Sequence, residues 1–200
     1  MRPKNACMLL LTAFIWGTAF VAQSVGMDYL EPFTFNGVRC LIGAIALLPC
    51  IWFFNRGKEK ENKINDENAK RDLIKGGIAC GILLFAASSL QQIGLVYTAA
   101  GKAGFITAFY IVLVPVFGIF LHKNIGWKVW TAVAIALAGL YFLCITEAFT
   151  IGVGDIYVFL CALIFSVHIL VVDHYSPKVD GVKLSCIQFL VAGIVSIPFM

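Results

Sequence analysis

Seven long apolar runs follow one another along the chain, separated by short polar segments. The runs cover residues 6–25, 33–54, 76–97, 103–121, 127–145, 156–172 and 184–200. A helix rises about 1.5 Å per residue, so about 20 residues cross the ~30 Å hydrocarbon core of a bilayer. Because the runs have about this length, the pattern predicts an all-α polytopic membrane protein in which seven transmembrane helices are present.

The basic residues are divided unequally between the two faces of this predicted membrane protein. When the runs are threaded in order, one face collects thirteen of the fifteen Lys and Arg residues, namely Arg2, Lys4, Arg56, Lys58, Lys60, Lys63, Lys70, Arg71, Lys75, Lys123, Lys128, Lys178 and Lys183. The other face has Lys102 and several acidic residues, and Arg39 falls inside a run. Cytoplasmic loops carry the Lys and Arg excess. We therefore predict a plasma-membrane protein whose N-terminus is cytoplasmic, as are the loops after the second, fourth and sixth runs.

Composition supports the same class of protein and narrows its partners. The chain is 60% hydrophobic and 13% charged, whereas soluble domains have roughly 45–50% apolar and ~25% charged residues. No basic stripe with interleaved aromatic residues is present, so the expected partners are the lipid bilayer and a small solute, not nucleic acid. The cysteines lie in or at the ends of apolar runs without a C-x-x-C pair, which indicates packing residues and predicts neither a metal site nor a cofactor.

The chain contains a weak internal repeat. Residues 10–49 align without a gap on residues 159–198, an offset of 149, with identical pairs such as Leu41 and Leu190. Five runs separate the two copies, and because five is odd, the second copy must enter the membrane from the opposite face. The alignment predicts a first five-helix repeat over 1–147 and the first two helices of a second, inverted repeat over 148–200. On this interpretation the chain is a fragment of a ten-span protein of about 300 residues.

Several polar side chains converge at one depth in the outer half of the membrane. Helix rise places each of them ~5–14 Å below the outer end of its run. They come from four different runs, which predicts a polar cavity lined by Trp16, Asn36, Arg39, Ser88, Gln91, Gln92, Thr107 and Tyr110. Two alternatives remain open for Arg39, which could pair structurally with Gln91 or Gln92 or could extend to the outer interface. Ser88 and Thr107 could instead bond to their own helices.

Two further positions bear on coupling and bending. No Asp or Glu lies within any run, so proton coupling would need His168 or Asp173, and uncoupled facilitation is an equal alternative. His168 could also be an ordinary packing residue. Pro115 interrupts the backbone hydrogen bonding of the fourth run, which predicts a helix break there, with a static kink as the alternative.

One string of residues resembles a catalytic motif. Residues 152–155 read G-V-G-D, the string of intramembrane aspartyl proteases, but no second Asp lies within a span. Asp155 at the start of a helix is better interpreted as an N-cap. The sequence therefore predicts no catalytic residue and no enzyme.

The motifs point to a known family. The strings WGTAFVAQ at 16–23 and LQQIGLVYTAAGKAGFITAFYIVLVP at 90–115, together with Arg39 and the Gly154-Asp155 pair, resemble the EamA-type permeases of the drug/metabolite transporter superfamily. One departure is His122-Lys123, where members usually carry a Glu before the basic residue. The resemblance implies a ten-helix inner-membrane carrier with two inverted repeats around a central cavity.

The resemblance and the cavity residues together define the expected function. We expect an inner-membrane secondary transporter of amino-acid-like or other carboxylate-bearing solutes that works by alternating access. The alternative is a membrane binding or regulatory protein that does not transport. Association of two copies as a homodimer is left open, and the 200-residue chain alone is expected not to transport.

Overall fold

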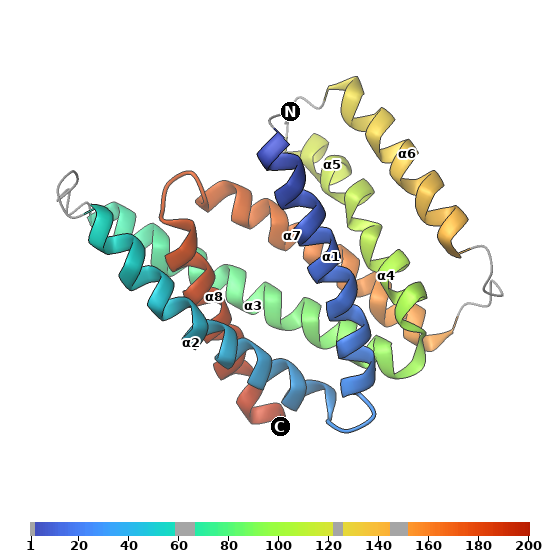
Figure 1. Ribbon diagram of the computed structural model, residues 1–200, viewed down its shortest axis with the longest axis horizontal. Helices are drawn as coiled ribbons and strands as arrows, with labels where there is room; N and C mark the ends of the chain where they lie inside the picture. The colour runs from blue at the N-terminus through green and yellow to red at the C-terminus, as the bar shows by residue number, and fades with distance from the viewer. Residues whose placement is uncertain (1–2, 59–66, 122–125, 145–151) are drawn as a thin grey trace.

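Eight α-helices and one 3₁₀ turn make up the part of the chain that this computed structural model describes, residues 3–58, 67–121, 126–144 and 152–200 (Figure 1). In chain order they are α1 (Pro3–Gly26), α2 (Pro32–Lys58), α3 (Glu67–Tyr97), α4 (Ala100–Ala108), α5 (Tyr110–Phe120), α6 (Trp127–Cys144), α7 (Val153–Tyr175), α8 (Gly181–Ser196) and η1 (Ile197–Phe199). Each of the seven predicted runs is therefore helical within the described residues. His122 and Lys123 lie outside those residues.

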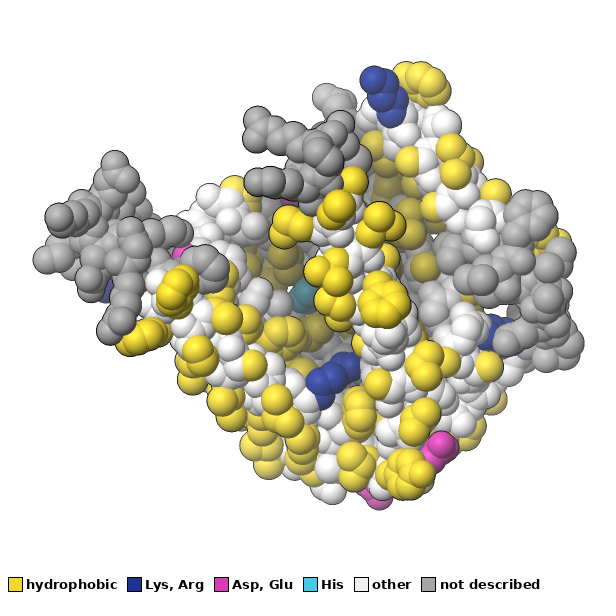
Figure 2. All heavy atoms as spheres, in the orientation of Figure 1, with side chains coloured by type: hydrophobic (Ala, Val, Ile, Leu, Met, Phe, Trp, Pro, Cys, Tyr) yellow, Lys and Arg dark blue, Asp and Glu magenta, His cyan; other side chains and the backbone are white. Residues whose placement is uncertain are grey.

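Six helical stretches are long and apolar enough to cross a membrane. They correspond to α1, α2, α3, the pair α4–α5, α7, and α8 with its 3₁₀ extension. The apolar part of α6, Trp127–Gly139, is shorter. Large apolar side chains cover much of the face drawn in Figure 2, as expected for helices that lie against lipid. The prediction of an all-α polytopic membrane protein is confirmed.

The fourth run forms two helices that meet at Phe109. The sequence predicted the break at Pro115, but Pro115 lies inside α5. Proline removes a backbone N–H and crowds the carbonyl four residues before it, here that of Ile111, which also lies inside α5. The N–H of Phe109 donates to the carbonyl oxygen of Ile106 at 3.1 Å, a tight turn that separates the two helices. The position of the break is therefore corrected to Phe109.

The long helix α3 is the centre of the packing. It runs antiparallel to α7, since Gly94 lies against Val158 near the start of α7 and Gly76 lies against Tyr175 at its end. On another face, Gly81 lies against Val191 of α8, where a Cβ on the glycine would be only 2.6 Å from the Val191 Cβ. Glycines of α3 thus let both α7 and α8 approach its backbone closely.

Helices α2 and α8 also pack closely and run antiparallel. Gly37 lies against Ser196, and Gly43 lies against Phe189. Cys186 Sγ lies 3.6 Å from the carbonyl oxygen of Ala44. The two helices assigned to a second repeat therefore pack directly on helices of the first, and α1 and α6 lie farther out, α1 against α3 and α4 and α6 against α4 and α5 (Figure 1).

Candidate functional site

A cavity of about 540 Å³ lies among six helices, α1, α2, α3, α5, α7 and α8. Figure 2 shows a hollow in the molecular face, with basic and histidine side chains visible in it. Most of the wall is apolar or aromatic, and a few polar groups interrupt it. The lining residues are Ile15, Trp16, Ala19, Phe20, Gln23, Arg39, Cys40, Gly43, Leu84, Ser88, Gln91, Tyr110, Phe165, His168, Ile169, Gln188 and Phe189.

Arg39 lies on the α2 side of the cavity and is held by two amide oxygens. Its Nη1 donates to Gln23 Oε1 of α1 at 2.6 Å, and its Nη2 donates to Asn36 Oδ1 at 3.1 Å. The guanidinium carbon also lies 5.8 Å from the centre of the Phe35 ring. No carboxylate of the described residues bonds to Arg39. A guanidinium has five N–H donors and keeps its charge. This side of the cavity is therefore positive, and further N–H donors of Arg39 remain for a solute.

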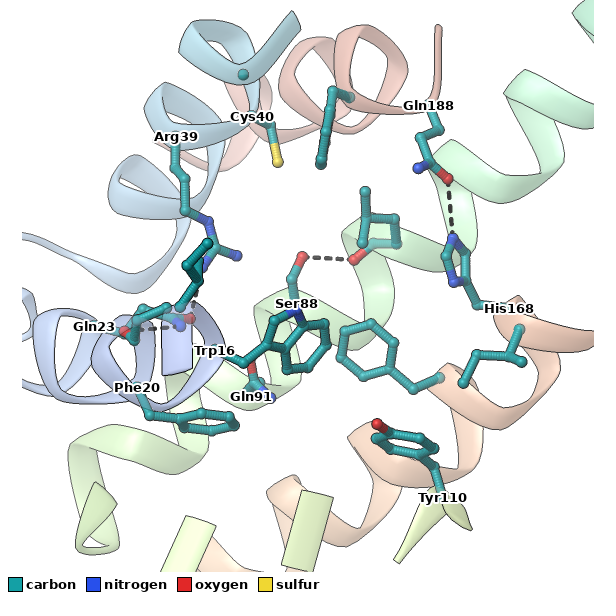
Figure 3. A pocket seen from close by; sticks show the side chains of 17 residues that line it. Trp16, Phe20, Gln23, Arg39, Cys40, Ser88, Gln91, Tyr110, His168 and Gln188 are labelled. Atoms are coloured by element: carbon teal, nitrogen blue, oxygen red, sulfur yellow. Dashed lines mark hydrogen bonds between the residues drawn. The ribbon is translucent and has the colours of Figure 1, made fainter. Parts of the chain in front are cut away.

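Five of the eight side chains predicted from the sequence line the cavity. They are Trp16, Arg39, Ser88, Gln91 and Tyr110. Ser88 also donates to the carbonyl oxygen of Leu84 in its own helix, one of the alternatives that the sequence left open. In Figure 3 the Trp16 ring lies between Arg39 and His168, and Tyr110 lies below His168 at the edge of the cavity.

The other three predicted side chains are buried behind the wall. Asn36 orients Arg39 and donates from Nδ2 to Ser89 Oγ at 3.4 Å. Thr107 accepts a hydrogen bond of 3.2 Å from Gln91 Nε2. Gln92 is fully buried, and neither atom of its amide has a hydrogen-bond partner among the described residues. These three lie on faces of their helices that the cavity does not reach.

The two residues considered for coupling lie in different surroundings. His168 is buried and lines the cavity, where its Nε2 lies 3.1 Å from Gln188 Oε1 of α8 (Figure 3). Asp173 is exposed near the end of α7 and does not line the cavity. Pro115 does not line it either.

Sequence reasoning missed two amides of the cavity wall. Gln23 ends the string WGTAFVAQ, and Gln188 lies in α8. A signal for Gln188 was available, because the 149-residue offset aligns it with Arg39. Gln23 had no comparable signal, since its contact with Arg39 depends on how α1 packs beside α2.

Asp155 is fixed by three donors at the start of α7. It receives hydrogen bonds from the Gly152 N–H at 2.8 Å and from Thr98 Oγ1 at 2.9 Å, and Lys102 Nζ lies 2.6 Å away. The N-cap is Gly152, and Asp155 occupies the third helical position, so the predicted N-cap is corrected. The reason is that a carboxylate at this position can reach back to the N–H of the cap residue. Within the described residues, no group of three or more His, Cys, Asp and Glu could hold a metal ion.

Membrane-length helices around a largely apolar cavity with a few polar groups define a polytopic membrane protein. The chain belongs to the EamA-like transporter family, whose model matches residues 4–145. This confirms the resemblance drawn from the strings at 16–23 and 90–115.

A curated relative supports the same assignment. The chain is 34% identical over 194 residues to an uncharacterized transporter of Archaeoglobus fulgidus, and the alignment covers 96% of this chain and 56% of the relative. The chain thus spans about half the length of the curated relative that it matches. No solved structure matches the chain.

Proposed function

We propose that the protein is a secondary transporter of the plasma membrane that moves small carboxylate-bearing solutes, amino-acid-like solutes among them, by alternating access. The observation that carries this proposal is the position of Arg39, which lines an intramembrane cavity and has only neutral hydrogen-bond partners among the described residues. Because the chain spans about half of its relative, the proposal concerns the complete gene product.

The charge of the cavity favours an anion. A charged side chain in the membrane is costly and usually serves a solute pathway or pairs with an opposite charge. Here the partners of Arg39 are the oxygens of Gln23 and Asn36, which orient the guanidinium but leave its charge uncompensated. A carboxylate can accept two parallel N–H bonds from a guanidinium. Binding a carboxylate solute would therefore supply the missing negative charge.

The size and lining of the cavity suit a small metabolite. Its volume of about 540 Å³ falls within the ~300–1,000 Å³ range of ligand pockets. Aromatic and aliphatic side chains form most of the wall, and a few polar groups are placed to orient a solute. A solute of amino-acid size or somewhat larger fits this description.

Alternating access is supported by the arrangement of α2 and α8. These helices align in the predicted repeat and run antiparallel, with Gly37 against Ser196 and Gly43 against Phe189. Inverted repeats bind the solute at their interface, and one repeat rocks against the other around the site. The excess of Lys and Arg on one face supports a cytoplasmic N-terminus.

The test compares the complete gene product with two arginine variants. Untargeted comparison of metabolites retained by cells with and without the gene identifies a carboxylate solute, whose saturable movement is then measured in vesicles. Arg39→Leu is expected to abolish this movement at normal membrane abundance. The matched control is Arg71→Leu, which removes an exposed Arg of α3 far from the cavity lining and is expected to retain transport.

Three outcomes would contradict the proposal. Normal transport by Arg39→Leu would exclude Arg39 as the anion site. Loss of folded protein in that variant alone would assign Arg39 a structural role. Binding of the solute without movement across the vesicle membrane would favour the alternative, a membrane binding or regulatory protein.

A further inference from the structure

The cavity wall repeats with the 149-residue offset. Helices α7 and α8 contribute Phe165, His168, Ile169, Gln188 and Phe189. The residues 149 positions earlier are Trp16, Ala19, Phe20, Arg39 and Cys40, and every one of them also lines the cavity. The 149-residue offset is a property of the sequence alone and does not depend on where the cavity lies. Five of the eight lining residues of α1 and α2 therefore have a lining counterpart in α7 or α8, whereas the counterparts of Ile15, Gln23 and Gly43 do not line the cavity.

The two sets carry their strongly polar groups at two repeat positions, and the groups differ at both. Arg39 aligns with Gln188, and Ala19 aligns with His168. The first repeat thus has a cation held by amide oxygens, whereas the second has an amide bonded to an imidazole at 3.1 Å. Figure 3 shows Arg39 and the His168–Gln188 pair on opposite sides of the cavity.

Arg39 and Gln188 also lie nearer to opposite faces of the predicted membrane. Arg39 is about two turns into α2, roughly 10 Å from the end of the helix near the extracytoplasmic face. Gln188 is equally far into α8, which begins near the cytoplasmic face. In a ~30 Å hydrocarbon core the two groups are therefore separated by roughly 10 Å along the membrane normal. The ring of Trp16 lies between them in Figure 3, and Phe20 and Phe165 also line the cavity.

We propose that the cavity takes a two-ended solute, with a single anionic group bound by Arg39 and an uncharged hydroxyl or amide group bound by Gln188 and His168. An apolar, preferably aromatic middle packs against the rings between them. This inference rests on the proposed function, because it concerns the same cavity and the same anion site.

Hydrogen bonding at the second end explains the preference for an uncharged group. When His168 Nε2 donates to Gln188 Oε1, the Gln188 amide nitrogen keeps two N–H donors that bond to no other described residue. A hydroxyl or carbonyl oxygen can accept from them. Among the described residues no Lys or Arg lines this end, so a second carboxylate would lack the counterion that the first one finds in Arg39.

Three probe compounds separate the two ends. They are 3-(4-hydroxyphenyl)propanoate with both end groups, 3-phenylpropanoate with the anion alone, and 3-(4-hydroxyphenyl)propanamide with no anion. Binding to the purified complete gene product is measured by titration calorimetry. The first compound is expected to bind roughly three- to tenfold more tightly than the second, the range expected for one neutral hydrogen bond. The third is expected to bind weakest.

Substitutions of Gln188 and Arg39 should separate the contributions of the two ends of the solute to its affinity. Gln188→Leu is expected to reduce the affinity for the hydroxylated acid to that for 3-phenylpropanoate, and the unchanged affinity for 3-phenylpropanoate shows that the variant is folded. If Gln188→Leu does not fold, Gln188→Met, closer in length, takes its place. Arg39→Gln is expected to reduce the affinity for both acids by the same factor. Asn68→Leu makes the same kind of change at an exposed amide of α3 and is expected to leave all affinities unchanged.

The outcomes separate this inference from the proposed function. The two-ended site would be overturned if the wild-type protein bound the two acids with equal affinity, or if it bound none of the three compounds. It would also be overturned if Gln188→Leu lost affinity for both acids equally. An Arg39→Gln variant that binds both acids normally would overturn the anion site, even if Gln188→Leu behaves as expected.

Discussion

Lys102 Nζ lies 2.6 Å from Asp155 Oδ2, and this ion pair joins the start of α4 to the start of α7. The pair is mostly buried, with 23% of the Lys102 side chain and 7% of the Asp155 side chain exposed. Asp155 also accepts from Thr98 and from the Gly152 N–H, so its carboxylate connects three segments of the chain. These contacts thus connect α7, the predicted first helix of the second repeat, to residues of the predicted first repeat.

This connection predicts an unequal effect of its two partners on stability. Asp155→Ala removes the acceptor of three donors and is expected to lower the free energy of unfolding by about 2–4 kcal/mol. Lys102→Met is expected to lower it by less, about 1–2 kcal/mol, because Thr98 and the Gly152 N–H still donate to the carboxylate. Thermal denaturation of the complete gene product in detergent measures both. Asp28→Ala, a change at an exposed carboxylate before α2, is the control; equal losses in all three variants would contradict the role of Asp155.

Gln23 allows the charge of the cavity to be changed without touching Arg39. In Gln23→Glu a carboxylate replaces the amide oxygen that lies 2.6 Å from Arg39 Nη1. This internal counterion should compete with an anionic solute, and carboxylate binding is expected to fall by at least tenfold. Gln23→Leu leaves the charge of Arg39 uncompensated. Its affinity for the carboxylate is expected to fall only a few-fold, because the guanidinium is less well oriented. Similar affinities of the two variants, measured by calorimetry, would show that the uncompensated charge does not attract the solute.

Glycine at the α3–α8 contact should be sensitive to a single methyl group. A Cβ at Gly81 would meet Val191 at 2.6 Å and the Gln188 carbonyl oxygen at 3.0 Å. Gly81→Ala is therefore expected to destabilise the protein by about 1–3 kcal/mol through overpacking. At Gly17 nothing lies within 4 Å of the added carbon, so Gly17→Ala should be neutral or slightly stabilising. The prediction is wrong if the two variants have the same melting temperature.

Membrane orientation is testable at two exposed positions. In a cysteine-free background, Asn68→Cys at the start of α3 should resist an impermeant thiol reagent in intact cells, because this face is predicted to be cytoplasmic. Tyr29→Cys, between α1 and α2, should react readily, since this residue is 82% exposed. The opposite labelling pattern would reverse the assigned topology.

The helices could be predicted from the sequence, because the length and spacing of the apolar runs indicate them. The direction in which a side chain points around its helix could not, and so Asn36, Gln92 and Thr107 were assigned to a wall that they do not line. The contacts of Arg39 with Gln23 and of Lys102 with Asp155 join separate helices, and their partners follow from packing rather than from spacing. The break at Phe109 lies six residues before Pro115, beyond the carbonyl that the proline ring crowds, so the position of the proline does not predict it.

The neutral partners of Arg39 also affect how a carrier built on this cavity would cycle. Without a bound anion the guanidinium is an uncompensated charge in surroundings of low dielectric constant, whereas with one the site is neutral. The empty form therefore pays an electrostatic penalty, which increases if its closing excludes water from the charge. In the proposed carrier, return of the empty form would then be the slowest step, and exchange of one anion for another would be faster than net movement of an anion.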